Sequence, residues 1–221
     1  AEMGVSVPSW KMANSISELI AILESDIKVK GELVVKPTNE RGGRGIFVIH
    51  DTLSEDKNRH GERELHISIR AFKDQYSRTG VISFPVMIME RLKDPVYDID
   101  MLAWQGKPIR LVARKRVNSA LPNEGHTIVD EPSLYEMGKQ LIKCFSLNWL
   151  YDCDVMFGED GNPYILEINP RPSGSFVTSI CAGVPLLDDL VSLAKGEKLP
   201  EVEIPYGRVI VPYKTLLNTS L

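Results

Sequence analysis

Four oxygen-bearing side chains near the end of the sequence flank a predicted turn. Asp160-Gly161 separates two extended, largely apolar stretches, and this arrangement is a strong signal for a β-hairpin. Side chains two residues apart along a strand share one face. A two-residue turn here, or a four-residue loop from 159 to 162, predicts two opposed pairs on that face: Asp154 with Glu167, and Asp152 with Asn169.

This acidic face needs a positive partner, because carboxylates that lie opposite each other destabilise a hairpin. Carboxylate and amide oxygens without His or Cys suit a hard cation such as Mg²⁺ or Mn²⁺. Arg171 follows Asn169 closely, and its guanidinium can clamp a phosphate beside such a cation. The alternative is that these residues are the solvated face of a half-buried hairpin.

A lysine within an apolar strand is the second chemical signal. Lys36 ends the run Leu33-Val34-Val35 and precedes a proline that keeps it extended. A buried lysine is costly without a partner, and a bound phosphate would supply one. The stretch Arg41–Gly45 follows, and its glycines Gly42, Gly43 and Gly45 let backbone N–H groups approach an anion. A plain hairpin tip is the alternative for this loop.

A third group of charged residues lies on the two strands predicted after residue 96. Arg114 and Arg116 alternate along one of them and so share a face, where they could bind phosphate or substrate, or form a solvated basic edge.

Taken in order, these segments resemble the ATP-grasp superfamily, and most closely its carbamoyl-phosphate synthase large-chain and biotin carboxylase type. The resemblance covers about residues 4–196 and rests on the following segments: Val34–Pro37, Arg41–Ile46, Ile88–Leu92, Tyr97–Ala103, Asp154–Phe157 and Glu167–Ser175.

The resemblance implies an α+β ATP-grasp fold in which two subdomains with antiparallel sheets enclose ATP. It implies that Lys36 contacts the α- and β-phosphates while the glycine loop closes over them. It further implies that Glu90 accepts from the adenine amino group and that the Leu92 backbone reads the ring edge. The family often has a Glu at the position of Val96 that contacts the ribose, and Asp98 or Asp100 could replace it here.

The same resemblance assigns metal and catalytic roles. It implies that Asp154, Glu167 and Asn169 hold Mg²⁺ or Mn²⁺, and that Arg171 steadies the transferred phosphoryl group or the acyl-phosphate. The implied protein is an ATP-grasp carboxylate–amine ligase, which converts ATP to ADP and phosphate while a small-molecule carboxylate is activated for attack by an amine or another nucleophile. The alternative is an ATP-binding fragment or module that lacks complete activity alone. In this family a preceding domain supplies substrate contacts and a further lysine, and we expect that N-terminal domain to be missing from this chain.

Secondary structure signals place the strands in adjacent pairs rather than in strict alternation with helices, which favours an α+β fold with antiparallel sheets. Capping boxes at Ser15 and Ser133 predict two helices, and a third is predicted over residues 186–194. Residues 54–72 suggest a weaker helix or an irregular segment. We expect an N-terminal subdomain over 1–92, with the lysine strand and glycine loop, and a C-terminal subdomain over 93–221, with the metal-binding hairpin.

Composition narrows the remaining possibilities. The 221 residues are 43% hydrophobic and 25% charged, as in an ordinary globular protein, and the formal net charge is −4. This charge gives no global attraction to nucleic acid, and no apolar run is long enough for a membrane span. Three cysteines without a CxxC motif, and no signal peptide pattern, favour a cytoplasmic protein. The sequence leaves the oligomeric state open, including a homo-oligomer.

Overall fold

The computed structural model describes residues 5–39, 45–52, 64–76, 80 and 82–213. The chain divides into two compact units, one from Pro8 to Leu92 and the other combining Ala1–Val7 with Lys93–Leu221. Residues 5–7 belong with the second unit rather than the first, because Val5 packs against its core and Ile165 N donates to Ser6 O at 3.0 Å.

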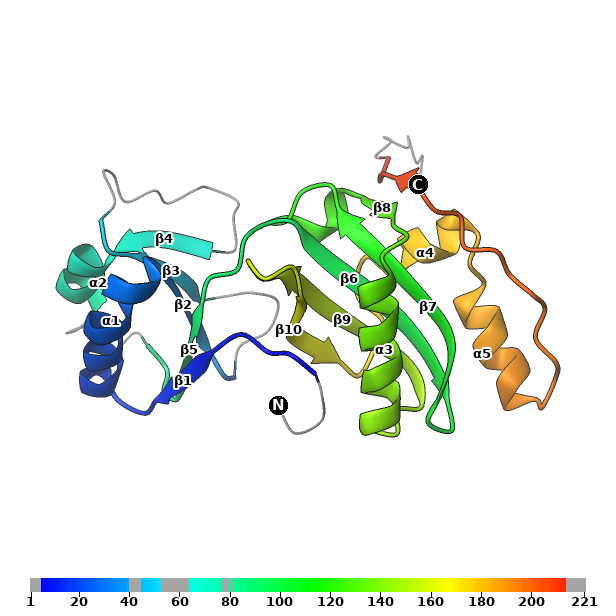
Figure 1. Ribbon diagram of the computed structural model, residues 1–221, viewed down its shortest axis with the longest axis horizontal. Helices are drawn as coiled ribbons and strands as arrows, with labels where there is room; N and C mark the ends of the chain where they lie inside the picture. Colours follow the sequence, from blue (N-terminus) through cyan, green and yellow to red (C-terminus); the bar gives the residue numbers. More distant parts are fainter. Residues whose placement is uncertain (1–4, 40–44, 53–63, 77–79, 81, 214–221) are drawn as a thin grey trace, which may run out of the picture. The chain divides into compact units, whose positions relative to one another are not determined.

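The unit Pro8–Leu92 is a sheet with helices on one face (Figure 1). Its described strands follow the order β1-β5-β2-β3-β4. Their bounds are β1 Trp10–Ala13, β2 Glu32–Pro37, β3 Ile46–His50, β4 Glu64–Ser68 and β5 Val86–Glu90. Neighbouring strands are antiparallel except β3 and β4, which are parallel.

Helix α1, Ile16–Lys30, begins as its capping box predicts. The Ser15 hydroxyl accepts from Glu18 N at 3.2 Å, and the Glu18 carboxylate accepts from Asn14 N at 2.8 Å. Together with α2, Ile69–Tyr76, this helix packs against alternate residues of the sheet. The resulting core contains Leu19, Leu23, Ile27, Leu33, Val35, Phe72, Val86 and Ile88. Lys36, Met87 and Met89 alternate with the core residues of β2 and β5, so they belong to the opposite face.

The other unit is built on an antiparallel sheet of order β10-β9-β6-β7-β8-β11 in its described part. Its strands are β6 Val96–Trp104, β7 Lys107–Arg116, β8 His126–Ile128, β9 Trp149–Phe157, β10 Pro163–Asn169 and β11 Val209–Ile210. Its helices are the 3₁₀ turn η1 Pro122–Glu124, and α3 Pro132–Cys144, α4 Val177–Ala182 and α5 Leu186–Ala194. Gln105 and Gly106 have positive φ and close the β6–β7 hairpin.

The two faces of this second sheet differ in chemistry. Odd-numbered residues of β6 and β9, such as Ile99 and Cys153, pack under α3 in an apolar core. Even-numbered residues occupy the opposite face, which is apolar at one end, where Leu102, Val112 and Leu150 pack with residues of α4 and α5. At the other end the same face carries aspartates and arginines. A charged cluster therefore lies beside a second apolar core on one sheet face.

Two local features of this unit depart from, or add to, the sequence prediction. The capping box expected at Ser133 is wrong: α3 begins one residue earlier at Pro132, and the Ser133 hydroxyl instead donates to Glu131 at 2.9 Å. Gly125 has φ +122°, and a Cβ there would lie 2.6 Å from Ile210 O, so this position lets β11 close onto β8. Among the described residues, no helix combines the length and the apolar character needed to cross a membrane.

Candidate functional site

Strand pairing arranges acidic and amide side chains in two rows across the sheet. One row runs through four strands in the order Glu167, Asp154, Asp98 and Arg114. The next row contains Asn169, Asp152 and Asp100. The opposed pairs predicted from the hairpin are thus present, and β6 extends each row by a further aspartate that the hairpin alone did not reveal.

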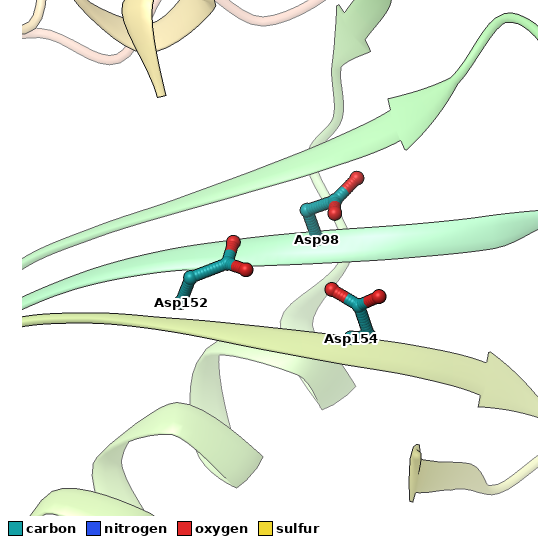
Figure 2. A group of neighbouring side chains, drawn as sticks. All are labelled: Asp98, Asp152 and Asp154. Atoms are coloured by element: carbon teal, nitrogen blue, oxygen red, sulfur yellow. The ribbon is translucent and has the colours of Figure 1, made fainter. Parts of the chain in front are cut away.

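Three of these carboxylates converge. Asp98, Asp152 and Asp154 each offer an oxygen, and these oxygens all lie within 4.8 Å of one another. Figure 2 shows the three side chains rising from β6 and β9 toward a common space. Asp98 and Asp152 are buried and Asp154 is partly buried, whereas Glu167 is exposed at the outer end of its row.

Arg116 bridges two members of the cluster. Its guanidinium makes two bonds to Asp98, of 2.9 and 2.6 Å, and Nη2 also donates to Asp154 Oδ2 at 2.7 Å. The buried His126 lies 3.0 Å from the same Asp98 carboxylate. Asp98 is 1% exposed and engaged on both oxygens, so the expectation that it binds a ribose is not met.

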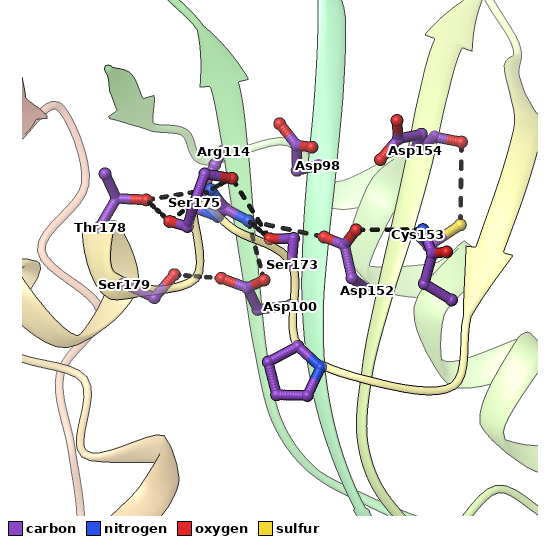
Figure 3. A network of polar contacts seen from close by, with 12 residues as sticks. Asp98, Asp100, Arg114, Asp152, Cys153, Asp154, Ser173, Ser175, Thr178 and Ser179 are labelled. Carbon is purple, nitrogen blue, oxygen red and sulfur yellow. Dashed lines mark hydrogen bonds and ion pairs between the residues drawn. The ribbon is translucent and has the colours of Figure 1, made fainter. Parts of the chain in front are cut away.

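Arg114 is buried, whereas an arginine that binds a ligand would have to be accessible. Its side chain is fully buried, and Nη2 donates to Asp100 at 2.8 Å. Nη1 donates to the Ser175 carbonyl and hydroxyl at 3.2 and 3.0 Å and to Thr178 at 2.9 Å (Figure 3). The expectation that Arg114 contacts phosphate or substrate is therefore not met, because the segment from Ser173 to Ser179 covers its side chain completely. Arg114 instead ties that segment to the sheet.

The remaining predicted residues of this unit lie at the rim of the cluster. Asn169 Nδ2 donates to Glu167 Oε1 at 2.9 Å and to Asp152 Oδ2 at 3.4 Å. Arg171 is exposed, and its Nη1 donates to the Pro172 carbonyl at 2.9 Å. Acid, amide and arginine thus follow one another along the exposed end of β10.

The pKa values of the cluster reflect burial and crowding of negative charge. Burial raises the pKa of Asp152 to about 8, and the charges of Asp154, Asp100 and Asp98 add to this effect. Burial also raises the pKa of Asp154, against the opposing influence of Arg116. For Asp98, burial opposes ionisation, but the bonds from His126 and Arg116 hold its pKa below the ordinary range.

These residues fit a divalent cation of the kind that the donor types suggest. Asp154, Glu167 and Asn169 offer carboxylate and amide oxygens from adjacent positions on one sheet face, which is the chemistry that Mg²⁺ and Mn²⁺ prefer. Burial and neighbouring carboxylates raise the pKa values of Asp152 and Asp154, so the ionised forms that bind metal are disfavoured without a cation. A bound cation would supply the missing positive charge.

The predicted nucleotide residues of the unit Pro8–Leu92 are only partly described. Lys36 is half-buried on the sheet face opposite the helices, and its neighbour across the strands is Met87. Gly42 and Gly43 lie outside the described residues. Gly45 has φ +70°, and a Cβ there would meet the Pro37 ring at 3.2 Å, so Gly45 lies close to the end of β2.

Glu90 does not offer its carboxylate in the way expected. Its two oxygens accept from Ser9 N at 2.7 Å and from Lys30 Nζ at 3.0 Å. The alternation of β5 places its side chain on the helix-covered face with Ile88, away from the face that carries Lys36. The Glu90 carboxylate is thus engaged by Ser9 and Lys30 and is not positioned for the expected bond to an adenine amino group. Leu92 lies beyond the end of β5, at the last position of its unit.

Comparison with known proteins places this architecture in a family. The model of a family described as "ATP-grasp in the biosynthetic pathway with Ter operon" matches residues 83–215, more than half of the chain. The chain therefore belongs to the ATP-grasp superfamily, and the expected α+β ATP-grasp fold is confirmed.

Individual relatives are distant. The chain is 24% identical over 220 residues to the carbamoyl phosphate synthase arginine-specific large chain of Geobacillus stearothermophilus, a match that covers 93% of this chain and 19% of that one. It therefore spans about a fifth of the length of that curated relative.

Two solved structures illustrate the similarity of fold. The ADP complex of purK, an N5-carboxyaminoimidazole ribonucleotide synthetase, aligns with a TM-score of 0.65 at 14% identity and covers 95% of this chain and 52% of its own. The biotin carboxylase domain of 2-oxoglutarate carboxylase from Hydrogenobacter thermophilus, solved with MgADP, ADP and bicarbonate, aligns with a TM-score of 0.62 at 17% identity. That match covers 93% of this chain and 45% of the other.

Proposed function

We propose that this chain is an ATP- and Mg²⁺-dependent ligase domain that activates a small-molecule carboxylate as an acyl-phosphate. The observation that carries the proposal is the row in which Glu167, Asp154 and Asp98 face one another across three strands, with Asn169 in the adjacent row. Such a concentration of oxygen donors at one end of this sheet face favours a bound cation in addition to Arg116. The names of the relatives, which include a carbamoyl phosphate synthase and a structure with MgADP and bicarbonate, support the same chemistry.

In this proposal the residues divide the work between cation and nucleotide. Asp154, Glu167 and Asn169 hold Mg²⁺, or Mn²⁺ in its place, which when bound neutralises charge on the nucleotide phosphates. Lys36 contacts the α- and β-phosphates, the loop with Gly42, Gly43 and Gly45 covers them, and the Leu92 backbone reads the base edge.

The arginines of the site have two different tasks. Arg171, exposed at the end of β10, contacts the transferred phosphoryl group. Arg116 is held beside Asp154 by Asp98, so its guanidinium has a fixed orientation next to the proposed metal ligand. A fixed donor costs no reorganisation when charge develops during reaction.

The proposed reaction is a pair of displacements. An oxygen of the substrate carboxylate attacks the γ-phosphorus of ATP, the bond from that phosphorus to the β–γ bridging oxygen breaks, and ADP leaves. The nitrogen of an amine, or another nucleophile, then attacks the acyl carbon, and phosphate leaves with the electron pair of the broken carbon–oxygen bond. The chain contributes orientation and charge neutralisation rather than a covalent nucleophile.

The length of the relatives favours a second candidate, an ATP-binding module that needs further protein for turnover. The chain covers 19% of the carbamoyl phosphate synthase chain, so contacts to substrate from other parts of a longer protein would be missing. An N-terminal pre-ATP-grasp domain would be the partner in that case.

One experiment separates the two candidates. Calorimetric titration of ATP with and without Mg²⁺ measures binding, and release of ADP in the presence of carboxylate and amine panels measures turnover. Binding with ADP release supports the ligase, and binding without release by this chain supports the module. Absence of Mg²⁺-dependent ATP binding contradicts both.

A further inference from the structure

The buried charges around the cluster do not cancel evenly. Arg114 is 2.8 Å from Asp100, and Arg116 makes a two-bond contact with Asp98 while also reaching Asp154 at 2.7 Å. Each arginine is thus committed to a partner other than Asp152. The contact from Arg114 Nη2 to Asp152 Oδ1 is 3.6 Å, longer than a hydrogen bond.

Asp152 is also poorly supplied with hydrogen-bond donors. Its side chain is 3% exposed. Within the described part of the chain, Oδ1 accepts no hydrogen bond, and Oδ2 accepts only a long one, 3.4 Å, from Asn169. Buried carboxylates are normally paired and hydrogen-bonded, because an uncompensated buried charge is costly. Asp152 therefore has a long ion-pair contact with Arg114, but its Oδ1 has no hydrogen-bond donor among the described residues.

The position of Asp152 shows where that partner would lie. Its register partner is Asn169, and its oxygens lie within 4.8 Å of an oxygen of Asp154. In Figure 2 its carboxylate points toward the space between Asp98 and Asp154. Asp98 faces the same space, but both its oxygens are engaged by Arg116 and His126.

We infer that Asp152 supplies a carboxylate oxygen to the divalent cation that Asp154, Glu167 and Asn169 are proposed to hold. The inference rests on the proposed function and extends its ligand set by one residue, from the row next to Asp154. Asp152 is then a binding residue for the cation. In the protein without metal its Oδ1 has no hydrogen-bond donor among the described residues, and the bound cation would take that place.

The test is Mn²⁺ binding to the isolated chain, measured by the electron paramagnetic resonance signal of free Mn²⁺ with and without ATP. Asp152→Asn keeps the size and the acceptor for Asn169 but removes the charge. We expect its Mn²⁺ dissociation constant to rise roughly tenfold or more. Glu159→Gln is the matched control, because it removes an exposed acid at the tip of the same hairpin and should leave the constant unchanged.

A second measurement distinguishes a cation ligand from a structural residue. Without metal, Asp152→Asn should unfold at a temperature no lower than that of the wild type, because Asp152 Oδ1 accepts no hydrogen bond within the described residues and little is lost with the carboxylate. A variant that fails to fold, or that is clearly less stable without metal, contradicts the inference by showing that Asp152 holds the fold. Lifetimes of bound Tb³⁺ luminescence in H₂O and D₂O should show an added coordinated water in Asp152→Asn.

The outcomes keep the inference apart from the proposed function. If the wild type binds Mn²⁺ and Asp152→Asn binds it equally well, the inference fails and the proposed function stands. If the wild type binds no Mn²⁺ with or without ATP, the proposed function fails and the inference fails with it.

Discussion

Asp154 lies directly opposite Glu167, and it does so because β10 contains one extra residue. From Pro163 to Ile165 the strand pairs in one register with β9, and from Glu167 onward it is shifted by one position. Leu166 is the residue that the ladder skips. Without this bulge the turn register would place Glu167 opposite Cys153, whose side chain belongs to the apolar core under α3.

Removing the charge of Glu167 tests the proposed cation site at its exposed rim. Glu167→Gln keeps the size of the side chain and the acceptor for Asn169, so the hairpin should fold as before. We expect the affinity for ATP in the presence of Mg²⁺ to fall roughly tenfold or more, with little change in its absence. Calorimetric titration measures both, and Glu159→Gln serves as the control. Equal Mg²⁺ dependence in both variants would count against the metal assignment.

Lys36→Ala tests the proposed phosphate contact in the other unit. Loss of one charged contact should raise the nucleotide dissociation constant by an amount equivalent to about 1.5–3 kcal/mol. Lys28→Ala, at an exposed position on α1, is the comparison because it changes the net charge equally. If the nucleotide dissociation constant of Lys36→Ala rises less than about tenfold while the variant remains folded, the lysine has a structural role instead.

The buried ion pair between Arg114 and Asp100 should make a large contribution to stability when one partner alone is removed. Arg114→Met leaves the Asp100 carboxylate buried without its cation, and we expect a loss of about 3–5 kcal/mol in the free energy of unfolding. Urea denaturation measures this loss. The double variant Arg114→Met with Asp100→Leu should recover part of it, since no lone charge remains. A loss below about 1 kcal/mol in the single variant would contradict a buried ion pair, because losses of that size are typical of solvent-exposed pairs.

Acid should weaken the contacts of Glu90 at the β1–β5 edge. Burial acts to raise the pKa of Glu90, but the Ser9 N–H and Lys30 outweigh it and hold the pKa below its usual value of 4.5. A depressed pKa means that the stabilisation is present above the unfolded value and is lost as the pH falls through the folded value. The difference in stability between wild type and Glu90→Gln should therefore be constant near neutral pH and shrink below about pH 4.5. Denaturation curves at several pH values measure it, and a difference that grows in acid contradicts the assignment.

The opposed pairs of the β9–β10 hairpin were predictable from sequence, although the predicted loop length was wrong. Asp160-Gly161 marks the turn and the alternation marks the inward acids, and the resulting pairs are those observed. The loop, however, is longer than the two or four residues expected, since Phe157 pairs with Pro163. The bulge at Leu166 offsets this difference, so two local deviations cancel at the acidic end. A register rule that counts from the turn cannot detect either one.

Sequence reasoning could not predict the role of a residue whose surroundings are set by segments distant in the sequence. Alternation correctly places Arg114 and Arg116 on one face, but only the return of the segment from Ser173 to Ser179 decides that Arg114 is fully buried. Glu90 is the last residue of an apolar strand, and its surroundings depend on where α1 packs, which places Lys30 beside it. Asp98 joins the cluster through the β6–β9 pairing, a contact between strands far apart in the sequence.

Short polar elements were missed for a different reason. The strand β4 has the sequence Glu-Leu-His-Ile-Ser, which is too brief and too polar to stand out, and the sequence suggested a helix or irregular segment there. Its pairing with β3 supplies the stability that its own composition lacks. The start of α3 was displaced because Pro132 can occupy the first helical turn and pre-empts the later serine.

The absence of a side chain at Gly125 links β11, the last strand of the described residues, to the charged cluster of the sheet. Because β11 approaches β8 over a bare α-carbon, a methyl group at 125 would lie 2.6 Å from Ile210 O, so the backbone there would have to shift. His126, the next residue, lies 3.0 Å from Asp98, so a shift here would reach the edge of the charged cluster. A homologue with alanine at this position could retain all the acids of the cluster and still bind metal poorly, because the backbone beside His126 would be displaced.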